Sequence, residues 1–376
     1  MQIRPTKALI NLDNLANNYR KISSRADGKE VIAVVKADAY GHGAIKIVEK
    51  LNTLEHPPVM YAVATVEEVI DLRETFPGIS ILIFEPFNRR FIDELRQYNI
   101  TATLSSIEQL VELQELDPQG KIDFHIKIDT GMGRLGVKHY EVYQLVEELK
   151  KNKTLSIKGI YTHFATSDED DASYTSLQIE RFEKVLRALK AAGISTGIVH
   201  SANSGGIFDH PSTHYDAVRA GISLYGYYKN RERSITEGLK PLMSLKSEIG
   251  TIRRFLAGEN VSYGLRYTTA IDTNIASIPV GYADGVRRAL QNRISIQIGG
   301  KTYPQAGTIT MDRIMVDLGD DHHPPGTEVV LLSDDFTSGC DGWYWCKVLD
   351  TIPYEVTCGI SSRVPRIYTE GSDGFC

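Results

Sequence analysis

A lysine at the end of an apolar run is the residue of this sequence whose position most favours chemistry. The run Val31–Val35 consists mostly of β-branched residues and predicts a buried parallel strand that ends at Lys36. Gly41 and Gly43 follow, which favours a tight turn just after the lysine. Partial removal of an amine from water lowers its pKa and frees its lone pair, so such a lysine can form a Schiff base. The same pattern also fits a lysine that extends from the core into solvent.

Apolar runs alternate with helical patterns up to about residue 228, so this lysine lies in a repeating architecture. The runs that predict strands are Val31–Val35, Val59–Val63, Ile79–Phe84, Thr101–Leu104, Ile122–Ile128, Ile157–Thr162, Gly197–His200 and Asp216–Val218. The helical patterns include Val66–Glu74, Ser106–Leu116, Tyr140–Lys150 and Tyr174–Ala192. About eight βα units in roughly 200 residues is the size of a TIM barrel. A doubly wound open sheet is the alternative, although no GxGxxG motif follows the first strand.

The pattern changes after a charged connector, Lys229–Arg233. Beyond it, short runs separated by Gly, Pro and Asp predict a mostly-β domain, and Trp343 and Trp345 alternate as in a strand. The predicted strands there are Ser244–Phe255, Thr273–Pro279, Ile294–Ile298, Ile314–Val316 and Glu328–Leu332, and an N-terminal run, Lys7–Leu12, predicts a strand of either domain. We therefore expect an α/β protein with an N-terminal TIM (β/α)8 barrel over residues 1–235 and a C-terminal mostly-β domain over residues 236–376.

The composition argues against several classes of protein. The 42 Lys and Arg residues against 48 Asp and Glu residues give a net charge of −6, and no basic block favours nucleic acid or a membrane surface. No apolar stretch is long enough to span a bilayer, and the first residues lack the apolar core of a signal peptide. The four cysteines form no CxxC pair, which favours reduced thiols. We expect a cytoplasmic protein without a metal site.

The ends of the predicted strands carry polar residues that a barrel would bring to one face, the face that holds the active site. These residues are Lys36, Asp129, Arg134, His163, Ser201, Asn203, Ser204 and Arg219. Barrels commonly bind phosphate at the last two strand ends, where Ser204, Gly221 and Ile222 offer hydroxyl or backbone N–H donors. A Schiff-base lysine and a phosphate cradle together are what pyridoxal phosphate requires.

The sequence around these residues resembles that of alanine racemases. The motifs that carry the resemblance are Val35–Gly43, Lys127–Gly136, His163–Ala165, Arg219–Ile222, Leu224–Gly226, Val261–Gly264, Gly281–Gly285, Met311–Asp312 and Ile352–Glu355. They follow one another over nearly the whole chain. The resemblance implies a fold-type III pyridoxal-phosphate barrel with a C-terminal β domain. It also implies a homodimer whose subunits share their active sites, and a role in supplying D-alanine for peptidoglycan.

The resemblance implies two catalytic bases, Lys36 for the D-alanine face and Tyr263 for the L-alanine face. A racemase removes the α-proton on one face and returns a proton on the other, so a base on each face avoids rotation of the substrate. Lys36 belongs to the expected barrel and Tyr263 to the expected β domain. In the family this tyrosine comes from the partner subunit, so the dimer would be required for activity.

Further roles are implied by the same resemblance. Arg219 faces the pyridine nitrogen, where a donor-only guanidinium makes the ring a weaker electron sink and suppresses transamination; His200 could hydrogen-bond it. The expected cofactor-binding residues are Lys36, Tyr40, His163, Ser204, Arg219, Gly221, Ile222 and Tyr354. The expected substrate-binding residues are Arg134, Met311 and Asp312, with a corridor lined by Asp168, Tyr282 and Arg288. Lys127 matches a position that is carbamylated in many members, and a bare ammonium there would repel Arg134.

One departure from the family pattern concerns the corridor. Thr308 stands where many members have arginine, which could relax the selection of substrate size or charge. A broader serine and alanine racemase is therefore an alternative. A pyridoxal-phosphate amino-acid decarboxylase and a non-catalytic pyridoxal-phosphate carrier are also alternatives. Arg219 and Tyr263 argue against the decarboxylase, and the second domain argues against the carrier.

Overall fold

The computed structural model of the protein describes residues 4–371, which form two compact units. The barrel unit comprises residues 18–39 and 44–224. The β unit comprises the described residues up to Asn17, the segment Tyr40–Gly43, and the described residues from Tyr225 onward.

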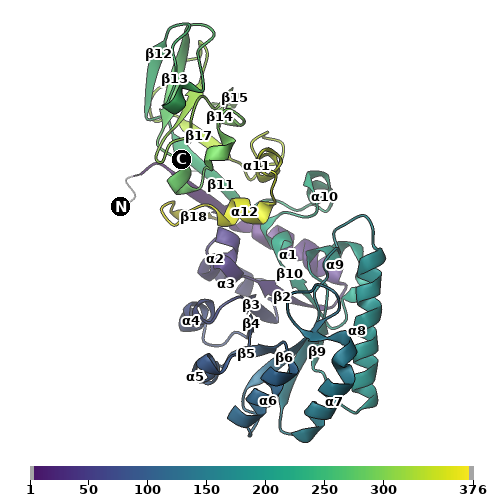
Figure 1. Cartoon of the computed structure of the whole chain (residues 1–376). Helices are drawn as coiled ribbons and strands as arrows, with labels where there is room; N and C mark the ends of the chain where they lie inside the picture. Colours follow the sequence, from purple (N-terminus) through teal and green to yellow (C-terminus); the bar gives the residue numbers. More distant parts are fainter. Residues whose placement is uncertain (1–3, 372–376) are drawn as a thin grey trace. The chain divides into compact units, whose positions relative to one another are not determined.

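The barrel unit is built on eight parallel strands that close into a ring (Figure 1). The strands are β2 (Glu30–Val34), β3 (Met60–Val63), β4 (Ile81–Pro86), β5 (Thr101–Leu104), β6 (Asp123–Asp129), β8 (Ser156–Tyr161), β9 (Ile198–His200) and β10 (Ala217–Ala220). The pairing of β5 with β6 closes the ring, so the TIM barrel is confirmed and the open sheet is excluded. A short strand, β7 (Val137–Lys138), pairs with β6 outside the ring.

Helices connect the strands and cover the outside of the barrel (Figure 1). They are α1 (Leu12–Ala26), α3 (Ala44–Asn52), α4 (Val66–Thr75), α5 (Ile92–Gln97), α6 (Ile107–Leu116), α7 (Val142–Lys151), α8 (Ser173–Ala191) and α9 (Ser204–Asp209). Two of them begin with a side-chain cap: Thr65 caps α4 and Ser106 caps α6, each accepting a backbone N–H of the first turn. Helix α8 is followed by Gly193 with a φ of +72°, which relieves the helix end at no steric cost.

The β unit contains two sheets. One has the order β15-β14-β17-β11-β1-β18 and the other the order β12-β13-β16. Their strands are β1 (Lys7–Asn11), β11 (Met243–Glu248), β12 (Thr251–Phe255), β13 (Thr273–Ile278), β14 (Ser295–Ile298), β15 (Lys301–Pro304), β16 (Ile314–Asp317), β17 (Glu328–Leu332) and β18 (Arg366–Thr369). Strand β1 pairs with β11 and β18, which assigns the N-terminal run to this unit.

Two predictions for the β unit are wrong in detail. The run Ser244–Phe255 is not one strand, because it breaks around Gly250 into β11 and β12, which belong to different sheets. The two tryptophans lie in a helix, α11 (Gly342–Leu349), and not in a strand. Asp341 caps this helix by accepting the N–H groups of Trp343 and Tyr344, and two alternating residues are too few to establish a period. Two further helices are α10 (Arg231–Thr236), which begins inside the charged connector, and α12 (Pro353–Cys358).

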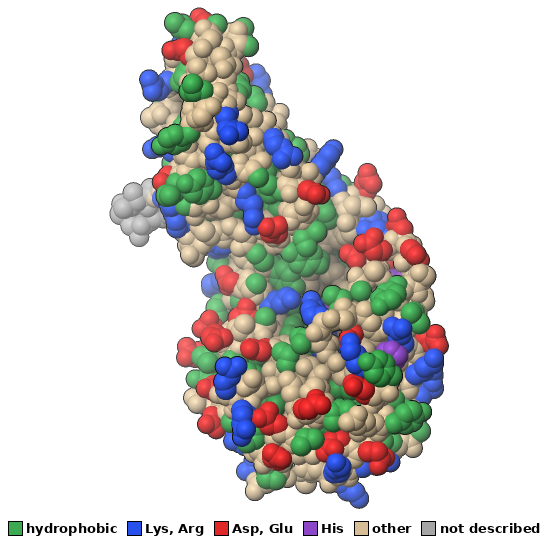
Figure 2. All heavy atoms as spheres, viewed as in Figure 1, with side chains coloured by type: hydrophobic (Ala, Val, Ile, Leu, Met, Phe, Trp, Pro, Cys, Tyr) green, Lys and Arg blue, Asp and Glu red, His purple; other side chains and the backbone are tan. Residues whose placement is uncertain are grey.

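The surface of the barrel unit carries both signs of charge. On the face shown in Figure 2, acidic and basic side chains of this unit are interspersed. Among residues 4–371, none of the helices combines the length and the apolar character that crossing a membrane requires.

Gly159 in β8 offers a test of barrel packing, because it lies opposite His125 of β6. A Cβ atom at Gly159 would lie 2.5–2.7 Å from the His125 ring. We expect Gly159→Ala to lower the free energy of unfolding by about 1–3 kcal/mol, through overpacking. Urea unfolding followed by circular dichroism measures the effect. Gly78→Ala is the control, since a Cβ there meets no atom within 4 Å; equal stability of the two variants would contradict the prediction.

Candidate active site

Lys36 lies at the carboxyl end of β2, as the sequence predicts. The N–H of Val35 still bonds to the carbonyl of Ala62 at 2.9 Å, and the chain leaves the sheet at the lysine. Lys36 is half-buried and begins the short helix α2 (Lys36–Gly41). The amine is therefore attached to a rigid strand at the face where barrel enzymes hold their substrates.

The backbone that follows Lys36 is left-handed. The φ angles of Ala37, Asp38, Ala39 and Tyr40 lie between +51° and +55°, so α2 is a left-handed turn of four residues that have side chains. L-residues lose roughly 1–2 kcal/mol each in this region. Gly41 continues the turn with a φ of +83° and allows close approach of the Thr357 carbonyl. Such strain persists only where surrounding contacts hold it, and it is typical of functional sites.

The side chain of Glu68 makes one of the contacts that hold this turn. Its Oε1 accepts the N–H of Ala37 at 2.5 Å, and its Oε2 accepts the N–H groups of Ala64 at 2.7 Å and Thr65 at 3.2 Å. Asp38 contributes a second contact, since its Oδ1 accepts the N–H of Ala44 at 2.7 Å. The sequence indicates Glu68 only as an acid in the first turn of α4, because nothing in the spacing reveals its contact with a residue 31 positions away.

Four cationic side chains gather in the barrel and are called the cation cluster here: Lys36, Lys127, Arg134 and Arg219. Burial first, and then the charges of the other three, lower the pKa of Lys127 to about 8. The Lys127 Nζ and the Arg219 Cζ lie 5.5 and 5.3 Å from the ring centre of Tyr161. Such a concentration of positive charge favours an anionic ligand.

Asp129 offsets the charge of the cation cluster only in small part: it raises the pKa of Lys127 less than burial and the other three cations lower it, and its carboxylate is bound elsewhere. It accepts the ammonium of Lys138 at 2.5 Å and the N–H groups of Gly131 at 2.9 Å and Gly133 at 3.1 Å. Burial opposes its charge, but these hydrogen bonds hold the pKa of Asp129 below its usual value. Asp129 therefore shapes the turn that carries Arg134, which is exposed.

Arg219 is buried at the end of β10 and is held by hydrogen bonds from two of its nitrogens. Its Nη1 donates to the Nδ1 of His200 at 3.1 Å, which confirms the expected contact, and its Nη2 lies 3.2 Å from the Nδ1 of His163. The remaining acceptors are carbonyls of Thr162 at 2.8 Å, Ser201 at 2.9 Å and His200 at 3.1 Å. Burial lowers the pKa of Arg219 to about 10, which still leaves it protonated at neutral pH.

Arg219 determines the tautomers of the histidines around it. A guanidinium has no acceptor, so the Nδ1 atoms of His163 and His200 must accept and their protons must sit on Nε2. The Nε2–H of His200 then donates to the Nδ1 of His125 at 2.9 Å. Burial, and then the charge of Arg219, lower the pKa of His125 to about 3 and the pKa values of His163 and His200 well below 6.5. The three rings are neutral at physiological pH.

His125 is a site residue that the sequence reasoning missed. It lies two positions before Lys127 in β6, so both side chains face the barrel interior. The two-residue spacing between His125 and Lys127 along one strand is the sequence signal that could have identified His125 as a site residue. Its Nε2 is buried without a hydrogen-bond partner among the described residues.

The predicted phosphate-binding residues of the barrel unit lie together. The Ser204 Oγ is 3.0 Å from the Ser223 Oγ and accepts the Ser223 N–H at 3.3 Å. Gly221 and Ile222 immediately precede Ser223 and lead into a 3-10 turn. Hydroxyl and backbone N–H donors beside a cation cluster and an amine are the donor set that fits a small group bearing an aldehyde, an acceptor nitrogen and a phosphate.

Two predicted cofactor residues lie in the β unit. The rings of Tyr40 and Tyr354 have centroids 5.7 Å apart, and Tyr40 also packs 4.7 Å from Tyr225. Burial, with smaller effects of Tyr354 and Cys358, raises the pKa of Tyr40, so its hydroxyl keeps its proton as a hydrogen-bond donor.

Tyr263 borders a cavity of about 810 Å³ in the β unit, called the Tyr263 cavity here. The residues that line it are Ser262, Tyr263, Tyr282, Arg288, Thr308, Ile309, Thr310, Met311, Asp312, Arg313 and Met315. Tyr263 itself is 74% exposed. The cavity brings the predicted base together with Met311, Asp312, Tyr282 and Arg288. Asp168, the third predicted corridor residue, is an exposed residue of the barrel unit.

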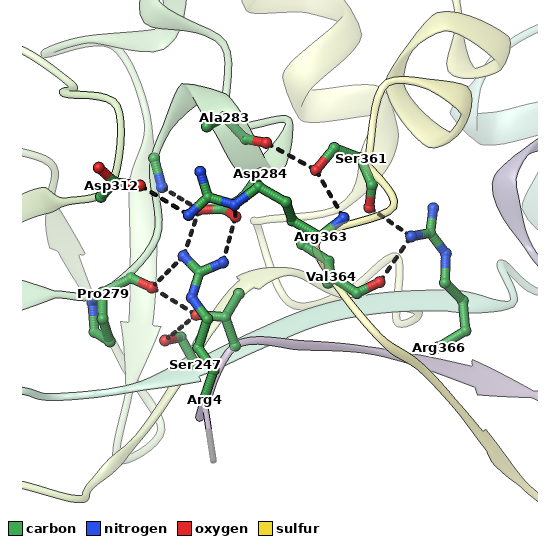
Figure 3. A network of polar contacts seen from close by, with 12 residues as sticks. Arg4, Ser247, Pro279, Ala283, Asp284, Asp312, Ser361, Arg363, Val364 and Arg366 are labelled. Atoms are coloured by element: carbon green, nitrogen blue, oxygen red, sulfur yellow. Dashed lines mark hydrogen bonds and ion pairs between the residues drawn. The ribbon is translucent and has the colours of Figure 1, made fainter. Parts of the chain in front are cut away.

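A buried carboxylate, Asp284, lies in a network of polar contacts that includes Asp312, one of the residues lining the cavity (Figure 3). Arg4 binds it with two nitrogens, at 2.5 and 2.6 Å, and the Gly281 N–H donates to it at 2.9 Å. Arg363 lies 3.5 Å from Asp284 and donates to Asp312 at 2.8 Å. Asp284 therefore holds Arg4, which precedes β1, and Arg363 links Asp284 to the loop that carries Asp312.

Gly281 allows the loop that carries Thr310 and Met311 to pack closely against its backbone. A Cβ atom at Gly281 would collide with the carbonyls of Thr310 and Met311. The N–H groups of Tyr282 and Ala283 instead donate to those carbonyls, at 3.0 and 3.1 Å. The turn formed by the Gly281–Gly285 motif therefore packs against the loop that carries Met311 and Asp312.

The closed parallel barrel, with a lysine at one strand end and a buried arginine at another, and the C-terminal mostly-β domain define a class of two-domain TIM-barrel proteins. The family model "Alanine racemase, N-terminal domain" matches residues 10–229, and the model "Alanine racemase, C-terminal domain" matches residues 242–368. The chain therefore belongs to the alanine racemase family, whose members are isomerases.

Individual relatives agree with this assignment. The chain is 41% identical to an alanine racemase of Carboxydothermus hydrogenoformans over 97% of this chain and 100% of that protein. It is 38% identical to an alanine racemase of Clostridium novyi over 99% and 97% of the two chains. Among solved structures, alanine racemase of Streptomyces lavendulae matches with a TM-score of 0.91 at 31% identity over 99% and 98%. That of Clostridium difficile matches with a TM-score of 0.90 at 36% identity over 98% and 97%.

The tautomers that Arg219 imposes can be observed directly. We expect nitrogen-15 NMR to show His125, His163 and His200 protonated on Nε2 and uncharged at neutral pH, because burial and then the charge of Arg219 hold their pKa values well below the usual value. Free histidine in the same buffer is the control and titrates near about 6.5. The His125→Gln variant assigns the signals of the hydrogen-bonded pair His125 and His200. An imidazolium signal from His200 at neutral pH would contradict the arrangement.

Proposed function

We propose that the protein interconverts L-alanine and D-alanine with pyridoxal 5'-phosphate as its cofactor. The observation that carries the proposal is the cation cluster, in which a strand-end amine lies near a buried, donor-only Arg219. A carboxylate at this position would favour other pyridoxal-phosphate reactions, such as the decarboxylation considered above. The full-length match to alanine racemases supports alanine as the substrate.

The donor set supports pyridoxal phosphate. When bound, this cofactor draws electrons from the α-carbon and so acidifies its hydrogen. Lys36 would bind its aldehyde, Arg219 would donate to its ring nitrogen, and His163 would stack on its ring. Hydroxyl and backbone donors would hold the phosphate: Ser204, Gly221 and Ile222 from the barrel unit, and Tyr40 and Tyr354 from the β unit.

Two bases would act on opposite faces of the substrate. Lys36 would exchange the proton on the D-alanine face and Tyr263 the proton on the L-alanine face. In this proposal the C-terminal β domain, residues 236–376, supplies Tyr263 to the barrel domain, residues 1–235, of a partner subunit. The exposure of Tyr263, Leu265 and Met311 on the single chain supports a homodimer that covers them.

Other residues would bind the substrate. Arg134 and the loop with Met311 and Asp312 would hold the carboxylate of the amino acid, and Arg363 keeps Asp312 in place. Because Thr308 removes a cation from the corridor, serine is a second candidate substrate. We further propose a cytoplasmic enzyme that supplies D-alanine for peptidoglycan and needs neither nucleic acid nor membrane.

Deuterium wash-in tests this function. We expect the protein with pyridoxal phosphate and L-alanine in heavy water to yield D-alanine that carries deuterium at Cα. Lys36→Ala and Tyr263→Phe should each lower the rate by about 10²–10⁴-fold, since each removes a proton-transfer group. Tyr143→Phe is a matched control, because Tyr143 is equally exposed but lies on α7.

Other products of the same assay separate the alternatives. Carbon dioxide release would indicate the decarboxylase, and bound cofactor without any Cα exchange would indicate the carrier. Faster conversion of serine than of alanine would show that serine, and not alanine, is the main substrate. Conversion that survives in Tyr263→Phe would contradict the two-base assignment.

Carbamylation of Lys127 is a separate prediction. Carbon dioxide reacts only with an unprotonated amine, and a pKa of about 8 in place of 10.5 gives about 300-fold more free amine at pH 7. The anionic carbamate would also relieve the repulsion from Arg134 and Arg219. We expect labelled carbon dioxide to give a carbamate NMR signal that falls as the pH drops below about 8, where the amine gains its proton. Lys127→Ala is the control; a signal that it retains would contradict the assignment.

A further inference from the structure

Tyr263 lies in a turn whose backbone is strained. Ser262 and Leu265 have φ angles of +68° and +50°, and Gly264 between them has +71°. Only the glycine adopts this region without cost. The turn is also exposed, so packing of the Tyr263 side chain does not hold it in the single chain. Other contacts must fix its backbone.

Thr308 supplies two of these contacts. Its Oγ1 donates to the carbonyl of Tyr263 at 2.6 Å, and its own carbonyl accepts the Ser262 hydroxyl at 2.8 Å. These reciprocal hydrogen bonds are called the Thr308 clamp. Thr308 is only 2% exposed although it borders the Tyr263 cavity. The preceding Gly307 has a φ of +79°, and a Cβ atom there would lie 2.6 Å from the Val261 carbonyl, so a glycine lets the two segments meet.

An arginine at this position could not form the same clamp. The short bond to the Tyr263 carbonyl requires a donor on the γ atom, whereas the donors of an arginine, Nε and the two Nη atoms, lie about two to four bonds farther along a flexible chain. Where many family members have an arginine, Thr308 therefore provides a hydrogen bond that restrains the backbone at Tyr263. Arg288 and Arg313 remain as cations that line the cavity.

We propose that Thr308 is a positioning residue that fixes the backbone at Tyr263 and so holds the base that serves the L-alanine face. This proposal rests on the proposed function. It predicts an asymmetric defect when the hydroxyl is lost. Proton exchange by Lys36 on the D-alanine face continues, whereas transfer by the misplaced Tyr263 slows, because small displacements of a reacting group cost large factors in rate.

The test starts from D-alanine in heavy water. It measures the ratio of deuterated D-alanine to L-alanine formed. We expect Thr308→Val to raise this ratio by about ten- to a hundredfold, and Thr308→Ser, which retains the hydroxyl, to restore it. The ratio is decisive because the equilibrium between the enantiomers forces kcat/KM for the two directions to change together.

A matched control separates positioning from general destabilisation. Thr269 is also 2% exposed, and its hydroxyl also donates to a carbonyl at 2.6 Å, that of Leu256. We expect Thr269→Val to leave the ratio unchanged. An equal ratio in Thr308→Val and the wild type, or an equal rise in both valine variants, would overturn the proposal.

Amide hydrogen exchange of the segment 261–267 gives a measurement that does not depend on activity. We expect faster exchange in Thr308→Val than in Thr308→Ser or the wild type, because valine keeps the carbonyl that accepts from Ser262 but loses the hydroxyl that donates to the Tyr263 carbonyl. Unchanged exchange would overturn the clamp. A wild-type protein that binds the cofactor but does not exchange alanine would overturn the proposed function, and faster exchange in Thr308→Val would then still establish the clamp.

Discussion

The buried charge of Arg219 is the constraint on which the barrel site depends. A guanidinium removed from water is costly unless acceptors surround its N–H groups. The structure supplies carbonyls of Thr162, His200 and Ser201 and ring nitrogens of His163 and His200. These acceptors follow or end β8 and β9, so Arg219 at the end of β10 is satisfied only when the barrel places the three strands side by side. The neutral state of the histidines follows first from their burial and then from the charge of the arginine, which also offers them only donors.

The balance of charge explains why an anion belongs in this site. Lys36, Lys127 and Arg134 add to the charge of Arg219, and the nearby Asp129 is already bound by Lys138 and two backbone N–H groups. The barrel therefore has an excess of positive charge at one end. A phosphate-bearing cofactor, a substrate carboxylate and a carbamate on Lys127 would each reduce that excess. Burial lowers the pKa of Lys127 most, and the same excess of positive charge lowers it further, since protonation adds one more positive charge.

The sequence reveals the architecture well and the local restraints poorly, for a physical reason. Several barrel strands contain apolar runs whose burial on both faces leaves a continuous signal, as Val31–Val35 and Met60–Val63 illustrate. The break at Gly250 and the helix around Trp345 depend on a turn and on the Asp341 cap, which short windows do not resolve. Contacts such as the one from Glu68 to Ala37 depend on tertiary structure alone. The strand-end position of Lys36 is readable from the sequence, whereas its pairing with Tyr263 depends on motif resemblance, because no periodicity relates two residues so far apart in the chain.

The two proposed bases share one structural device. Lys36 is followed by four residues in the left-handed region, and Tyr263 is flanked by Ser262 and Leu265 in the same region. In each case a side chain bonds to the strained backbone: Glu68 accepts from the turn after the lysine, and Thr308 donates to the turn of the tyrosine. A base that must reach one face of a small substrate has little tolerance for displacement. Strain held by a specific hydrogen bond restricts the backbone to one conformation, which a flexible loop could not do. The cost in stability is thus the physical consequence of directing each base to a single face.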